Sequence, residues 1–134
     1  MSSPTGLYSL LKQGRVIRLV EILPGERDAP LSCTLIETSL DSQHQYRALS
    51  YVWGDVNIRA PILCNGIEFH VTLNLISAMK QIRSVEIPVT FWIDAICINQ
   101  DDLKERAAQV QMMRDIYRSA ELVIVHLGED VPGL

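Results

Sequence analysis

The spacing of apolar residues predicts strands that alternate with helices over the second half of the chain. Apolar runs at 46–53, 91–98 and 121–127 are typical of strands that are buried on both faces. Between them, the apolar residues of 75–82 and 103–117 recur every three or four positions, as they do along one face of a helix. Alternation of this kind indicates right-handed crossovers and a mainly parallel sheet with helices on its faces.

Two antiparallel hairpins are predicted from the turn residues. Residues 15–38 contain two β-like runs, and Pro24-Gly25 ends the first of them. Residues 62–69 contain Asn65-Gly66 between two short apolar runs, and this dipeptide is the strongest short-range hairpin signal. We therefore expect an α/β domain that also carries an N-terminal β-hairpin.

The stretch 91–117 is the most informative part of the sequence, because Asp94 lies inside its apolar run. A buried carboxylate is costly unless it is hydrogen-bonded or lies where a strand emerges into solvent. A polar turn follows, and then a helix that we expect to bury one apolar stripe. The residues of this stripe are Leu103, Ala107, Val110, Met113 and Tyr117.

Polar residues and one large aromatic residue gather at the carboxyl ends of the predicted parallel strands, where open α/β sheets bind their ligands. The amino terminus of the long helix points to the same edge, and its free N–H groups favour an anionic group such as phosphate. The sequence therefore predicts a polar crevice suited to a nucleotide. Its candidate ligand-binding residues are Ser50, Trp53, Gly54, Asp55, Asp94, Asn99, Gln100 and Arg106.

Several of these residues also have plain structural explanations. Glu105 lies three residues after Asp102 in a relative of the capping box, so we interpret it as a helix cap and not as a catalytic acid. Arg106 can pair with a protein carboxylate instead of a phosphate. Asp94 can fix its own turn or contact a ligand, and Trp53 can be a rim aromatic or a stacking platform. The residues expected to be structural are Tyr46, Tyr51, Glu105, Gln109, Met113 and Tyr117.

Composition and charge argue against several classes of protein. A chain of 134 residues suits one domain, and we expect residues 1–45 to pack on the same domain as residues 46–134. The net charge of -4 argues against binding to nucleic acid. No apolar run approaches the roughly 20 residues of a membrane span. The three scattered cysteines indicate reduced thiols in a cytoplasmic protein, and the scattered histidines give no metal-ligand spacing.

Three blocks of the sequence resemble the fungal heterokaryon incompatibility (HET) domain. Two are continuous, YRALSYVWG at 46–54 and WIDAICINQ at 92–100, and both are long and unusual. The blocks follow the order of the family and cover residues 46–128, although His126 stands where the family often has a tryptophan. The third block consists of the spaced residues Glu105, Arg106, Gln109, Met112, Met113, Ile116, Tyr117 and Ala120.

The resemblance implies a cytoplasmic signalling domain of fungal allorecognition, a form of innate immunity. Such a domain assembles with itself or with protein partners and triggers programmed cell death. HET domains are similar to TIR domains, so the resemblance also implies a TIR/flavodoxin-like sheet and NAD cleavage as a further activity. TIR domains that cleave NAD use a glutamate on the helix after their third strand, and that helix would follow Leu134 here.

The domain is therefore expected to be incomplete at its C-terminal end, and no catalytic glutamate is assigned. Asp94 stays the candidate catalytic acid. Three functions remain open: a signalling module, an NAD glycohydrolase with NAD as substrate and no certain cofactor, and a non-catalytic fragment of a larger protein.

Overall fold

The computed structural model describes residues 6–12 and 14–128, which form one seven-stranded sheet and three helices. The strands are β1 Val16–Ile22, β2 Ser32–Ser39, β3 Arg47–Tyr51, β4 Arg59–Cys64, β5 Ile67–Thr72, β6 Val89–Trp92 and β7 Val123–His126. The helices are α1 Leu73–Ile82, α2 Asp94–Cys97 and α3 Leu103–Ser119. The α/β class expected from the sequence is confirmed.

The sheet is mixed, so the prediction of a mainly parallel sheet is wrong. The strand order is β5-β4-β2-β1-β6-β3-β7. The longest ladders, β1–β2 and β4–β5, are antiparallel, and β1 also pairs antiparallel with β6. The parallel pairs are β2–β4, β3–β6 and β3–β7. The reason for the difference is that both predicted hairpins join the same sheet as the parallel strands, with β1 at its centre.

The two hairpins themselves form as the turn residues predict. β1 pairs with β2 over its whole length, from Val16 opposite Ser39 to Ile22 opposite Cys33. Between β4 and β5, Asn65 and Gly66 have φ angles of 54° and 75°. Positive φ at both central residues is what a tight two-residue hairpin turn requires.

The predicted strand at 91–98 is shorter than expected, because β6 ends at Trp92. The next residues form the single helical turn α2, whose carboxyl end is closed by a hydrogen bond from Ile98 N to Asp94 O. Ile96 and Cys97 are buried, as a strand would also have buried them. A short apolar run has no periodicity that distinguishes a helical turn from a strand, which explains the wrong prediction.

Both longer helices begin at a residue whose side chain caps the helix, and for α3 this is the predicted Asp102. Thr72 caps α1 by accepting a hydrogen bond from Leu75 N, and Asp102 caps α3 by accepting one from Glu105 N. The predicted stripe of α3 is wrong in part, since Leu103 is 73% and Val110 is 50% exposed. The buried residues of α3 are Gln109 and Ile116, with Met112, Met113 and Tyr117 half-buried beside them.

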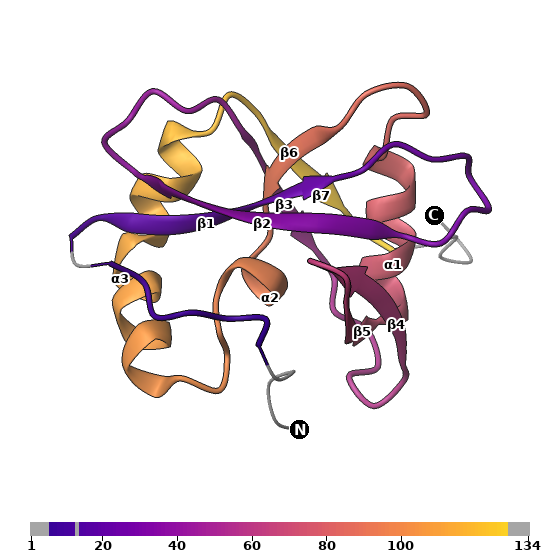
Figure 1. Cartoon of the computed structure of the whole chain (residues 1–134), viewed down its shortest axis with the longest axis horizontal. Helices are drawn as coiled ribbons and strands as arrows, with labels where there is room; N and C mark the ends of the chain where they lie inside the picture. Colours follow the sequence, from indigo (N-terminus) through magenta and orange to yellow (C-terminus); the bar gives the residue numbers. More distant parts are fainter. Residues whose placement is uncertain (1–5, 13, 129–134) are drawn as a thin grey trace.

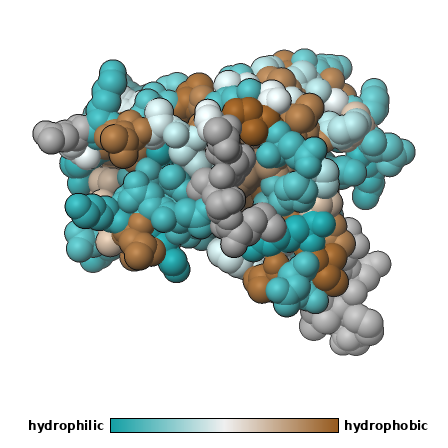
Figure 2. Space-filling view, turned by 60° about the horizontal axis from the view of Figure 1, so that its bottom comes forward, coloured by the Kyte–Doolittle hydropathy of each residue, from teal (hydrophilic) through white to brown (hydrophobic). Residues whose placement is uncertain are grey.

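The helices flank the parallel part of the sheet. In Figure 1, β6, β3 and β7 lie between α3 at the left and α1 at the right, and α2 lies below the crossing strands. Figure 2 shows the lower face of that view, where hydrophobic side chains are scattered among hydrophilic ones. Scattered exposed apolar residues are normal for a protein surface. Within residues 6–12 and 14–128, no helix has the length and apolar character needed to cross a membrane.

Candidate functional site

Asp94 is the first residue of α2 and lies just beyond the end of β6. Its backbone carbonyl accepts hydrogen bonds from Ile98 N at 3.2 Å and from Gln100 Nε2 at 2.9 Å. Burial raises the pKa of the Asp94 carboxyl group above its usual range, and the backbone N–H groups of Ala95 and Asp94 offset only part of this effect. A carboxyl group with a raised pKa can serve as a proton donor as well as an acceptor.

Aromatic side chains connect Asp94 to the end of β3. Burial, and after it the charge of Asp94, raises the pKa of both Tyr51 and Tyr117, so both phenols lie within electrostatic range of the carboxylate. Tyr51 stacks on Trp53, with ring centroids 6.2 Å apart and ring planes 1° apart. Tyr117 meets the edge of Trp92 at 5.3 Å. Trp53 therefore lies beside a phenol that is within electrostatic range of Asp94, and Trp53 is exposed enough to stack on a planar ligand.

Asn99 and Gln100 act on the turn between α2 and α3. Gln100 holds the carbonyl of Asp94, as described above. Asn99 donates its backbone N–H to Glu105 Oε2 at 2.6 Å, and its Oδ1 accepts a hydrogen bond from Asp101 N at 3.3 Å. These bonds fix the position of Asp94 relative to α3.

The remaining predicted ligand-binding residues lie in three places. Ser50 is half-buried in β3, opposite Val125 of β7. Asp55 follows Trp53 in the loop after β3, and its Oδ1 accepts a hydrogen bond from Asn57 N at 2.9 Å. Arg106 is exposed in the first turn of α3. Ser50 and Asp55 therefore lie along the strand and loop that carry Trp53, whereas Arg106 lies on the helix.

Gly54 is required by the loop that carries Trp53. Its φ is +70°, and a Cβ atom there would lie 2.5 Å from Nδ2 of Asn74. This Asn74 atom donates to the carbonyl of Val52 at 3.0 Å and so fixes the loop to α1. The close approach and the positive φ both disfavour a side chain at residue 54.

Substitution of Gly54 by alanine should lower the free energy of unfolding by about 1–3 kcal/mol, because the new Cβ both strains the backbone and displaces Asn74. Gly66→Ala is the matched control, since its φ is also positive but its Cβ would meet nothing within 4 Å. Urea unfolding of both variants measures the difference. Equal losses would show that the contact with Asn74 contributes nothing.

The raised pKa of Asp94 predicts a pH dependence. The folded chain binds this proton more tightly than the unfolded chain, so stability falls as the pH rises from 3.8 through the folded pKa. Asp94→Asn should remove this fall and should be more stable than the parent chain above that window. Urea midpoints measured across the window test this, with the exposed Asp28→Asn as control. A constant difference between the Asp94→Asn and parent chains at every pH would contradict it.

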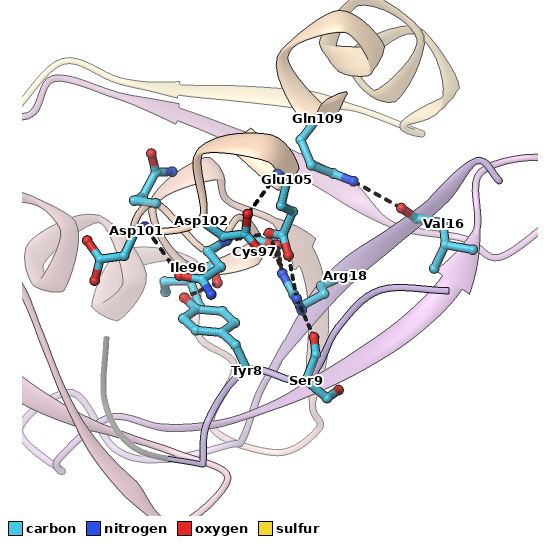
Figure 3. A network of polar contacts seen from close by, with 12 residues as sticks. Tyr8, Ser9, Val16, Arg18, Ile96, Cys97, Asp101, Asp102, Glu105 and Gln109 are labelled. Carbon is cyan, nitrogen blue, oxygen red and sulfur yellow. Dashed lines mark hydrogen bonds and ion pairs between the residues drawn. The ribbon is translucent and has the colours of Figure 1, made fainter. Parts of the chain in front are cut away.

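Arg18 and Glu105 form a buried ion pair beside the turn between α2 and α3, and the sequence did not predict it (Figure 3). Arg18 of β1 makes two bonds of 2.7 Å to the two carboxylate oxygens of Glu105, and the two side chains are 3% and 8% exposed. Arg18 also donates to the carbonyl of Cys97 at 3.1 Å and to that of Ser9 at 2.8 Å. One signal in the sequence could have found it, since Arg18 is a charged residue with apolar neighbours on both sides in β1.

The segment before β1 belongs to the same network. The hydroxyl of Tyr8 donates to the carbonyl of Ile96 at 2.7 Å, and the guanidinium of Arg18 lies 4.8 Å from the centre of the Tyr8 ring. On the other side, Gln109 Nε2 donates to the carbonyl of Val16 at 3.0 Å. Figure 3 shows these bonds joining the N-terminal segment, β1, α2 and α3 around one centre.

Glu105 therefore has a structural role, but a different one from the predicted cap. Asp102 caps α3 through Glu105 N at 3.1 Å, whereas the Glu105 carboxylate pairs with Arg18 and with Asn99 N. The helix terminus thus already holds two protein carboxylates. Asp102 already accepts the bond from Glu105 N, so this terminus offers a phosphate fewer free N–H groups.

Comparison with known proteins settles the family. The sequence model of the heterokaryon incompatibility protein (HET) family matches residues 46–132. This chain belongs to the HET family. It is 36% identical over 129 residues to heterokaryon incompatibility protein 6, OR allele, of Neurospora crassa, a match that covers 86% of this chain and 19% of that protein. No solved structure matches the chain.

The match to the HET family begins at Tyr46, yet the described HET fold depends on earlier residues. β1 and β2 lie inside the sheet, between β4 and β6. Tyr8 bonds to α2, and Arg18, whose guanidinium also bonds to Ser9 O, bonds to both α2 and α3. The loop that carries Asp94 is therefore held by side chains outside the matched region.

Four buried side-chain polar atoms have no hydrogen-bond partner among residues 6–12 and 14–128. They are Nε of Arg83, Nε1 of Trp92, Oε1 of Gln109 and Nε2 of His126. Trp92 contacts Tyr117, and His126 lies opposite Tyr51, so both belong to residues next to the Asp94 cluster. An unpartnered buried polar atom costs free energy unless something satisfies it, and a bound ligand is one way to do so.

Two hollows open on other parts of the surface. One, of about 600 Å³, lies between the β1–β2 loop and α1, and the other, of about 300 Å³, lies beside the β2–β3 loop. Neither is lined by Asp94 or by another predicted ligand-binding residue. Within the described part of the chain, no group of three or more His, Cys, Asp and Glu side chains is arranged to hold a metal ion.

Proposed function

We propose that this HET domain acts in heterokaryon incompatibility as a signalling module whose assembly, with itself or with a protein partner, triggers programmed cell death. The observation that carries the proposal is the family match together with 36% identity to a Neurospora crassa protein named for heterokaryon incompatibility. Because the chain covers 19% of that relative, the remaining parts of such a protein contribute to partner choice in this proposal. The free, buried cysteines Cys33, Cys64 and Cys97 are consistent with the cytoplasm as its compartment.

Inducible expression in a filamentous fungus tests the proposal. The chain, placed in its native full-length protein and also alone, should reduce hyphal survival in a vital-dye assay. Leu103→Lys, on an exposed position of α3, is a control that should keep the effect, and Arg18→Met, which breaks the buried ion pair, should lose it. Unchanged survival at matched protein levels, with both forms expressed, would reject the proposal.

A second candidate function, NAD cleavage of the TIR type, is supported by the cluster around Asp94. The parallel strands follow the order β6-β3-β7, in which the first strand along the chain is central, as in flavodoxin-like sheets. Asp94 has a raised pKa at the carboxyl end of this unit, and Trp53 offers a surface for a nucleotide base. Glycosidic cleavage needs a carboxylate that stabilises a cationic sugar-like transition state or directs water.

The second candidate is tested by measuring NAD loss and nicotinamide release with purified protein. Asp94→Asn is the matched variant, because it keeps the size of the side chain and removes the charge. Trp53→Ala separates binding from chemistry, since loss of stacking should raise KM more than it lowers kcat. Nicotinamide release at the same rate from parent and Asp94→Asn chains would exclude Asp94 as the acid.

A further inference from the structure

Cys33 and Cys64 are directly paired in the sheet. β2 runs parallel to β4, and Cys33 lies opposite Cys64 in the two-residue ladder that joins these strands. Neighbouring strands lie about 4.8 Å apart, and this falls within the roughly 4.4–6.8 Å that separates the Cα atoms of a disulfide. Both residues are buried, with exposed fractions of 2% and 0%, and both are free thiols. The strand register therefore brings two reduced thiols within reach of a disulfide.

The two thiols interact with each other and differ in reactivity. A hydrogen bond from the Cys33 thiol stabilises the thiolate of Cys64, so it lowers the pKa of Cys64, and burial offsets part of this effect. The same bond, together with burial, raises the pKa of Cys33. Burial also raises the pKa of the third thiol, Cys97, to about 12. Since the thiolate is the nucleophilic form of cysteine, Cys64 is the most reactive of the three.

The cysteine pair lies beside an exposed turn. Sγ of Cys33 donates to the carbonyl of Leu63 at 3.4 Å, and Leu63 is itself 45% exposed. Cys64 is followed at once by the exposed Asn65. At this point the two-residue ladder attaches the β4–β5 hairpin to β2 (Figure 1). Because a short ladder next to an exposed turn opens at a lower free-energy cost than the core of a sheet, a small oxidant can reach the two thiols.

We propose that Cys33 and Cys64 form a reversible redox site, at which a hydroperoxide such as hydrogen peroxide joins them in a disulfide. The Cys64 thiolate attacks one peroxide oxygen, the O–O bond breaks, and hydroxide leaves and takes up the proton that Cys64 released. The sulfur of Cys33 then attacks the sulfenic acid on Cys64, the S–O bond breaks, and water leaves with the proton of Cys33. The two thiols lose two electrons, and these reduce the peroxide to two molecules of water.

The disulfide fastens the β4–β5 hairpin to β2. It closes a loop of about 30 residues, and this restriction of the unfolded chain should raise the thermal midpoint by roughly 10 °C. Reduction by a thiol reverses the bond. Disulfides in reducing compartments are usually transient and redox-sensing, which agrees with free thiols in the resting chain. Neither cysteine belongs to the predicted ligand-binding set, so the inference does not depend on the proposed function.

Mass spectrometry of the purified 134-residue chain tests the proposal. Brief exposure of the reduced, folded chain to dilute hydrogen peroxide should remove the mass of two hydrogen atoms. After unfolding, one thiol should still react with an alkylating reagent. Fragment mapping should place the bond between Cys33 and Cys64 and the free thiol at Cys97, and dithiothreitol should restore all three thiols. Thermal unfolding without reductant, followed by circular dichroism, should show the expected rise of the midpoint.

Alanine variants test the role of each thiol. Cys33→Ala should stop at the sulfenic acid on Cys64, which a cyclic diketone reagent captures, whereas Cys64→Ala should carry much less label on Cys33. Neither variant should gain thermal stability from peroxide. Cys97→Ala is the matched control, because it also replaces a buried cysteine, and it should form the disulfide and gain the same stability as the parent chain. Each variant is compared in its oxidised and reduced forms, so the cost of the substitution itself cancels.

Several outcomes would overturn the inference. One is a folded parent chain that keeps three free thiols in peroxide and forms a disulfide only when urea unfolds it. Another is a bond that includes Cys97, within one molecule or between two. A disulfide between Cys33 and Cys64 that leaves the thermal midpoint unchanged would show that the bond does not fasten the hairpin. Stronger diketone labelling of Cys33 than of Cys64 would reverse the order of attack.

Discussion

Replacement of Arg18 by methionine should lower the free energy of unfolding by about 3–5 kcal/mol, because it leaves the carboxylate of Glu105 buried without its partner. The loss also removes the donors to the carbonyls of Ser9 and Cys97. Glu105→Gln should have an effect of similar size, since it leaves the guanidinium buried against a neutral group and weakens the bond to Asn99 N. Urea unfolding followed by circular dichroism measures both changes.

Arg15, the residue before β1, provides a matched control for the Arg18 substitution. It pairs with Asp41 at 2.9 Å and with Asp115 at 3.3 Å, but its side chain is 45% exposed. Exposed pairs contribute little because water screens them. Arg15→Met should therefore leave the urea midpoint nearly unchanged. If Arg15→Met and Arg18→Met destabilise the chain equally, burial is not what makes the Arg18 pair important.

The double variant Arg18→Met/Glu105→Gln separates charge from hydrogen bonding. If the unpaired charge dominates, the double variant should be more stable than the sum of the two single losses predicts. It should still be less stable than the parent chain, since the backbone groups of Ser9, Cys97 and Asn99 lose their charged partners. Additive losses would show that the two residues act independently.

Local chemistry explains what the sequence predicted correctly. Asn65-Gly66 determines its turn because the required positive φ angles are a property of those two residues. Asp102 begins its helix because its side chain bonds an N–H group three residues later. Such features are visible in a few consecutive residues.

Features that depend on distant parts of the chain were not predictable. Nothing in residues 16–22 shows that this strand becomes the centre of the sheet, because hydrophobic pattern does not encode strand order. Leu103 and Val110 were predicted to be buried, since they continue an apolar stripe, but α3 packs with the side that carries Gln109 and Ile116. The polar Gln109 is buried because Val16 offers a carbonyl to its amide.

In the candidate site, too, features set by neighbouring residues were predicted and features set by distant residues were not. Asp94 and Trp53 were chosen because they lie at predicted strand ends. In the structure Tyr51 stacks on Trp53, and burial followed by the charge of Asp94 raises the pKa of Tyr51. The ion pair that positions the Asp94 loop joins residues 87 positions apart, so no local pattern reveals it. The only signal in the sequence is an arginine in the middle of a buried strand, and this signal does not predict which acidic residue pairs with it.

A chain that begins at Tyr46, where the HET match begins, should not fold. It would lack β1 and β2, which join the β5-β4 pair to the β6-β3-β7 unit. Removal of β1 alone takes four side chains out of the core. They are Ile17, Leu19, Val20 and Ile22, and none of them has any exposed surface in the intact chain. Burial of one such side chain is worth about 1.5–3 kcal/mol, so the four together are worth about 6–12 kcal/mol, which is comparable to the roughly 5–15 kcal/mol by which a whole domain is stable.

The expected result for this truncated chain is a collapsed amide-proton NMR spectrum and no cooperative thermal transition. A chain that begins at Gly6 is the matched control, because it retains every described element and should unfold cooperatively. A shorter control that begins at Gly14 removes Tyr8 and Ser9 but keeps β1, so it should fold with reduced stability as Arg18 loses two contacts. A cooperative transition in the chain from Tyr46 would mean that the matched region folds without the central strands, and the boundary of the HET domain would then lie at residue 46.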